Sequence, residues 1–207
     1  MTFFSRLYRI RFARLRLYKH ALQSFIVLTV LMSGVVSAHT LRPAVATLDL
    51  QESGQLDIQV RTSAEALLAG IGPETVDTDD APTADIYNSL RALSSSELAA
   101  RFDDFVPEFL SKVMLRTFNG SASNSLSLNY LGIEVPEPGD LELLRDSTIY
   151  LQVRLPYEVD SVVWAWPRDY GSSVVRLITA ATPEPLTAWL QAGQVSDELP
   201  VSSAVLL

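Results

Sequence analysis

The residue best suited to a chemical role is His39, which follows the small residues of the segment Val36-Ser37-Ala38. If the chain is cut after Ala38, the α-amino group and imidazole of His39 form a bidentate nitrogen pair that suits Cu(II) or Ni(II). The other histidine, His20, lies before that cut, so carboxylates would have to complete such a site. The sequence therefore favours an ordinary N-terminal residue at position 39, with copper or nickel binding by His39 as the alternative.

A second candidate is an acidic loop between two prolines, which holds Asp77, Asp79 and Asp80 and is followed by Asp85. Carboxylate oxygens are the ligands that Ca²⁺ prefers. The spacing lacks the glycine and glutamate of an EF-hand loop. Calcium binding and a solvated loop that leads into a capped helix are both consistent with this pattern.

A third candidate is aromatic. Trp164 and Trp166 are two residues apart, so in a strand they share one face. With Tyr170 they would form an aromatic platform for a sugar ring or a protein partner. Val163 and Ala165 make the other face apolar as well, which favours burial of both indoles in a core.

Catalytic motifs are scarce. The chain has no cysteine, one histidine after residue 38, no Gly-x-Ser-x-Gly sequence and no glycine-rich phosphate loop. A pair of carboxylates, as in glycosidases, stays open, because 24 acidic residues are available and no spacing singles out a pair. We therefore expect a non-enzymatic protein, with a carbohydrate-binding or glycosidase module as an alternative.

The N-terminal segment decides where these residues would work. Six Lys/Arg and no acid precede an apolar run at Phe25–Met32, and small residues follow it. This order predicts a signal peptide over residues 1–38 with cleavage after Ala38. An uncleaved signal anchor is the alternative, and either one exports the rest of the chain. The expected location is the periplasm or the outer face of the inner membrane.

Composition limits the exported part. Six of the 16 basic residues and none of the 24 acidic residues lie in 1–38, so the remaining 169 residues carry a net charge of −14. Such a surface repels phosphate backbones, and we expect no nucleic-acid partner. Without cysteine, stability must come from packing. We predict one domain over 39–200 and a tail at 201–207 that is too short to insert into a membrane.

The pattern of apolar residues predicts mostly strands. Alternation at 44–50, 55–61, 113–118, 125–131, 148–155, 161–166 and 173–180 gives about seven strands, with an edge strand or short helix at 187–193. Together they predict an Ig-like antiparallel β-sandwich. Helical spacing between about 64 and 112 predicts an α-helical insert. Within it, Asp85 is expected as an N-cap, Ser94 and Glu97 as a capping box, and Pro107 as a kink or break.

Three short sequences carry a family resemblance: Ala38-His39-Thr40-Leu41-Arg42-Pro43-Ala44, Tyr87–Leu93 followed by Ser96-Glu97-Leu98, and Trp164-Ala165-Trp166 with Tyr170-Gly171. The chain resembles the extracytoplasmic N-terminal part of HupE/UreJ-type bacterial membrane proteins, over roughly 38–200. That family is associated with hydrogenase and urease accessory functions and with nickel handling, and for this chain the resemblance implies an exported domain without the transport function. Family members continue into a transmembrane bundle, which this sequence does not contain. The expected role is therefore an accessory or binding domain that partners an integral membrane protein.

Overall fold

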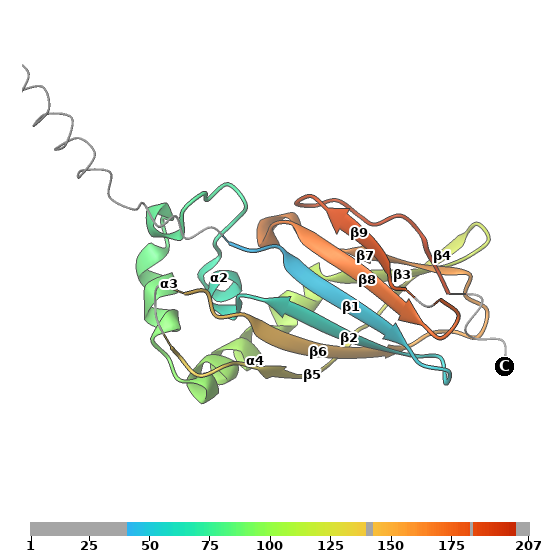
Figure 1. The fold of residues 1–207 in the computed structure, drawn as a ribbon, viewed down its shortest axis with the longest axis horizontal. Coiled ribbons are helices and arrows are strands. Elements are labelled where there is room, and N and C mark those ends of the chain that lie inside the picture. Colours follow the sequence, from blue (N-terminus) through green and yellow to red (C-terminus); the bar gives the residue numbers. More distant parts are fainter. Residues whose placement is uncertain (1–40, 140–142, 183, 202–207) are drawn as a thin grey trace, which may run out of the picture. The chain divides into compact units, whose positions relative to one another are not determined.

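The computed structural model describes residues 41–139, 143–182 and 184–201. Two β-sheets dominate this part of the chain, and three helices gather at one end of it (Figure 1). The larger, six-stranded sheet contains, in spatial order, β5 (Asn129–Glu134), β6 (Ser147–Arg154), β2 (Gln55–Thr62), β1 (Ala44–Leu50), β8 (Ser173–Thr179) and β9 (Leu186–Leu190). The smaller, four-stranded sheet contains β10 (Leu199–Pro200), β7 (Ser161–Ala165), β3 (Met114–Asn119) and β4 (Ala122–Leu126).

The centre of the larger sheet is the hairpin that the sequence predicts. In β2, Leu56, Ile58 and Val60 are buried, while the residues between them are half-buried or exposed. Because side chains alternate across a strand, this pattern turns one face of the hairpin toward the core. β1 pairs antiparallel with β2 on one side and parallel with β8 on the other. The larger sheet is therefore mixed.

Both sheets contribute to one hydrophobic core. The cluster joins Leu48 and Leu177 of the larger sheet to Leu115, Val162 and Trp164 of the smaller one. These five side chains have no exposed surface. Residues that are fully buried from both sheets in one cluster hold the sheets together by the removal of apolar surface from water.

The helical insert closes one end of this arrangement. It contains α2 (Ala64–Ala69), the 3₁₀ turn η1 (Thr78–Asp80), α3 (Ala84–Arg91) and α4 (Ser95–Lys112). A second 3₁₀ turn, η2 (Arg168–Tyr170), follows β7. α2 ends at Gly70, whose φ of 66° lies in the left-handed region that glycine adopts without strain. The predicted insert at 64–112 and its helical turn at 64–69 are confirmed.

The strand prediction needs three corrections. The described residues contain ten strands instead of about seven, and the β1–β8 pair is parallel instead of antiparallel. The strand expected at 125–131 is two strands, because the chain leaves the smaller sheet after Leu126 and joins the larger sheet at Asn129. Alternation continues through Ser127 and Leu128, so the period alone could not show a change of sheet. The strand order does not establish an Ig-like topology.

Two helix details also differ from expectation. The N-cap of α3 is Thr83, and Asp85 lies in the first turn, where a carboxylate interacts favourably with the helix dipole. α4 continues through Pro107 as one helix. Proline removes the hydrogen bond to the carbonyl of Asp103, but both residues lie on the exposed side, where water can reach that carbonyl. The buried Phe102 and Phe109 hold the helix on either side of the proline.

The predicted capping box is confirmed, and it leads to a testable prediction of how the free energy of unfolding depends on pH. The Ser94 side chain accepts a hydrogen bond from the Glu97 N–H, and the Glu97 carboxylate accepts one from the Ser94 N–H at 3.0 Å. The hydrogen bonds from Ser94 lower the pKa of Glu97 below its usual value. The stabilising contribution of Glu97 is therefore present above about pH 4.3, and it disappears as the pH falls through the lowered pKa.

We accordingly expect Glu97→Gln to reduce the free energy of unfolding at pH 7 and to have a smaller effect near pH 3. Urea titrations of both proteins at the two pH values measure this difference. An equal effect of the substitution at both pH values would contradict a role for the Glu97 charge.

Candidate functional site

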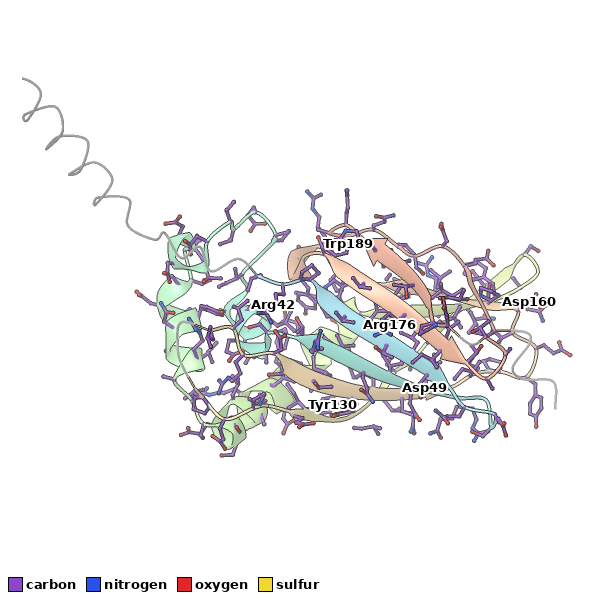
Figure 2. The ribbon with its side chains drawn as sticks, in the orientation of Figure 1. Arg42, Asp49, Tyr130, Asp160, Arg176 and Trp189 are labelled. Carbon is purple, nitrogen blue, oxygen red and sulfur yellow. The ribbon has the colours of Figure 1, made fainter. Side chains whose placement is uncertain are left out.

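At the helical end of the domain, the described surface has hollows whose lining is partly apolar. Figure 2 shows Arg42 at this end and Asp160 at the opposite end, beyond the strands. Three hollows lie here: one beside the first described residues, one between the helices of the insert, and one between α2, the end of α4 and Tyr170. A network of buried polar and aromatic side chains holds in place the helices that line these hollows.

The polar part of this network is centred on Arg145, in the loop between β5 and β6. Its Nε donates to Glu65 of α2 at 2.6 Å, and both side chains are buried, with 9% and 1% of their surface exposed. Its Nη atoms donate to the carbonyl oxygens of Leu90, Leu93 and Pro136 at 3.0–3.3 Å. One guanidinium group thus connects α2, the C-terminal end of α3 with the residues after it, and the segment that follows β5. We call this set of contacts the Arg145 bracket.

The aromatic part of the network connects α4 to both sheets. Phe102 packs 6.3 Å from the ring of Tyr130 in β5, and Phe109 packs 6.1 Å from Trp166, which follows β7. Tyr170 stacks on Phe109 at 12°. The Lys112 ammonium group lies 5.3 Å from the centre of the Tyr170 ring, within cation–π range. α4 is therefore held firmly along its buried face.

Burial of the two tryptophans is confirmed. Trp164 has no exposed surface and Trp166 has 2%. The sugar platform proposed for them is wrong, because a platform needs an exposed ring face. Tyr170 also belongs to this packed cluster.

The first hollow, which we call the N-terminal pocket, has a volume of about 200 Å³. Its walls come from the start of the described chain, from α2 and the loop that follows it, and from Tyr170; they include Leu41, Arg42, Pro43, Ala66, Leu67 and Ile71. Arg42 is exposed and lies 3.4 Å from Asp146, a pair that contributes little to stability. The chain thus enters the domain directly beside the helical insert.

The second hollow, which we call the insert groove, lies between α2, α3 and α4 and has a volume of about 520 Å³. Its apolar lining consists of Leu68, Ile86, Leu90, Leu93 and Phe105. Four of these are half-buried and pack against the core, whereas Ile86 is 52% exposed. Arg101 and Asp104 of α4 form its polar edge. This shape and lining suit the binding of an apolar surface.

Two tyrosines in this region have raised pKa values. Burial raises the pKa of Tyr170, with further increases from Glu108 and Asp169. Burial also raises the pKa of Tyr130, which donates a hydrogen bond to Asp103 at 2.7 Å. Both phenols are therefore protonated at neutral pH and are poor general bases.

The predicted metal ligands fall in different places. His39 and the cleavage residue Ala38 lie outside the described residues. Asp77 is the N-cap of η1, and its side chain accepts a hydrogen bond from the Asp79 N–H at 3.1 Å. Asp79 and Asp80 lie in the same turn. Within 41–139, 143–182 and 184–201, no three His, Cys, Asp or Glu side chains come together in a way that could hold a metal ion.

Sequence reasoning missed the two features that shape this end of the domain. The spacing of Ile86, Leu90 and Leu93 predicted an amphipathic helix, but not that part of its apolar face stays open. Arg145 lies in a loop without periodicity, so no local signal identifies it as a buried partner of Glu65. Among the described residues, no helix combines the length and apolar character that crossing a bilayer requires.

These features define a two-sheet β domain with a helical insert at one end and an apolar groove in that insert. In comparisons with known proteins, no family model and no curated protein matches this chain. The resemblance to HupE/UreJ-type proteins therefore stays a prediction from the sequence.

Proposed function

We propose that this protein is an exported, non-enzymatic accessory domain that partners an integral membrane protein of the HupE/UreJ type. The observation that carries the proposal is the position of the insert groove at the end where the chain enters the domain. An apolar groove there is available to a partner that lies at the membrane surface.

The distance along the chain supports this arrangement. Only His39 and Thr40 separate the predicted leader from Leu41, which lines the N-terminal pocket. The three steps from Ala38 to Leu41 span at most about 11 Å. If residues 1–38 are retained as an anchor, only two residues of chain connect them to Leu41 of the N-terminal pocket. If they are removed, the new first residue is His39, two positions before Leu41.

Metal binding through His39 is the alternative that the sequence predicts. A cleaved chain would place the amine and imidazole of His39 within two residues of the N-terminal pocket. Copper or nickel bound there would need further ligands from the rest of the chain. Partner binding gives a role to the insert groove, which metal binding at His39 does not, so we favour partner binding.

The test is fractionation of the protein in the organism that makes it, followed by N-terminal sequencing and gentle detergent extraction. We expect a chain that begins at His39, stays with the membrane fraction, and co-elutes with a protein that carries a HupE/UreJ-type bundle. A processed chain that is wholly soluble and elutes alone would overturn the proposal.

Point variants are the right probe of the groove in this test. Deletion of α4 would remove the buried Leu98, Phe102 and Phe109, and would disrupt the core as well as the groove. Ile86→Ser changes a half-exposed side chain at the groove edge and leaves the core intact. We expect it to release the processed chain from the membrane fraction.

A further inference from the structure

We propose that the insert groove binds a basic amphipathic helix, with leucine-like residues on one face and Lys or Arg beside them. This proposal deepens the proposed function, on which it rests, by specifying the chemistry of the partner. It follows from the lining of the groove and from the charge around it.

The groove has the features of a helix-binding site. Its walls are themselves helices, and its floor is made of the half-buried Leu68, Leu90, Leu93 and Phe105. A docked helix places residues at positions i, i+3, i+4 and i+7 into such a groove. The volume of about 520 Å³ is within the range of roughly 300–1,000 Å³ that is typical of binding pockets. It has room for several aliphatic side chains.

Charge determines which helix fits. The insert at 64–112 contains ten Asp or Glu and three Lys or Arg, a net charge of −7. At the groove itself, Arg101 and Asp104 lie on the edge, and the exposed Asp85 precedes the lining residue Ile86 in the chain. Neither aspartate forms an ion pair within the described residues. Complementarity therefore favours a cationic occupant.

The same charge disfavours two other occupants. A second copy of this chain would bring a second insert of net charge −7 against the first. An anionic lipid surface would be repelled for the same reason. A basic amphipathic helix satisfies both the apolar floor and the acidic surroundings.

The experiment uses the protein as exported and purified from a Gram-negative envelope. The probe is a fluorescent peptide of about 18 residues, five helical turns, with leucine on one face and lysine on the other. One comparison peptide has glutamate in place of lysine, and another has the leucine and lysine residues scrambled. Fluorescence anisotropy at about 0.15 M salt measures binding. We expect the amphipathic lysine peptide to bind and both comparison peptides to bind at least tenfold more weakly.

Four variants locate the site. We expect Asp104→Lys and Ile86→Ser to weaken binding about tenfold, and Arg101→Glu to strengthen it. Glu158→Lys makes the same charge change as Asp104→Lys, but on the exposed loop between β6 and β7, near Asp160 at the opposite end (Figure 2). It should change affinity less than twofold. Circular dichroism confirms that each variant is folded.

Several results would overturn the proposal. If Asp104→Lys and Glu158→Lys lowered the affinity for the lysine peptide equally, the peptide would be attracted to the acidic protein in general and not to the groove. Equal binding of the glutamate peptide would show that charge does not select the occupant. Concentration-dependent dimers that Ile86→Ser abolishes would assign the groove to a second copy. Loss of peptide binding with intact membrane co-elution would refute only this inference, whereas peptide binding without co-elution would refute only the proposed function.

Discussion

Replacement of Arg145 by methionine is expected to lower the free energy of unfolding by about 3–5 kcal/mol. The reason is the carboxylate that stays behind: Glu65 is 1% exposed and would lose its charged partner inside the protein. Three backbone carbonyls would lose a donor at the same time. Urea unfolding of the exported protein measures the effect. Total stabilities of about 5–15 kcal/mol are common, so this loss is a large fraction of the whole.

Two controls separate this mechanism from a general effect of losing an arginine. Arg154→Met makes the same replacement at an exposed side chain that donates to the Ser53 carbonyl, and it should cost no more than about 0.5 kcal/mol. The double variant Glu65→Gln/Arg145→Met removes the unpaired charge and should be more stable than Arg145→Met alone. If the double variant is as unstable as the single one, the buried charge is not the cause.

The second large effect is expected from Phe109→Ala, which should also cost about 3–5 kcal/mol. Phe109 has no exposed surface and packs against Phe102, Trp166 and Tyr170. Its removal leaves a cavity between α4 and the smaller sheet, which the surrounding rings cannot fill completely. Thermal or urea unfolding measures the loss.

The matched control is Trp189→Ala on the edge strand β9. Tryptophan is larger than phenylalanine, but Trp189 is 60% exposed. If burial decides the cost, this replacement should change stability by less than about 1 kcal/mol. A larger loss at Trp189 than at Phe109 would mean that β9 contributes more to the core than its exposure indicates.

Arg145→Met and Phe109→Ala would also affect the insert groove. The Arg145 bracket holds the C-terminal end of α3, and Phe109 holds α4, so these contacts position the two main walls of the groove. Variants that loosen either helix are therefore unsuitable as tests of binding. Ile86→Ser and Asp104→Lys lie at the groove edge and avoid this difficulty.

Local patterns in the sequence determined most secondary elements of this protein. Alternation identified the β1–β2 hairpin, and the Ser94–Glu97 spacing located the start of α4. These signals come from the period of side chains along a strand or helix and from hydrogen bonds within one turn. They involve residues that are near in the chain, and for that reason the sequence reveals them.

Tertiary structure alone decided how the elements are joined and which surface stays open. The parallel pairing of β1 with β8 connects residues more than 120 positions apart, and the Glu65–Arg145 pair spans 80 positions. No local pattern encodes such contacts. The same holds for the insert groove: helical spacing predicted the apolar faces of α3 and α4, but only packing determined how much of them the core could cover. The uncovered remainder is the surface that we propose a partner binds.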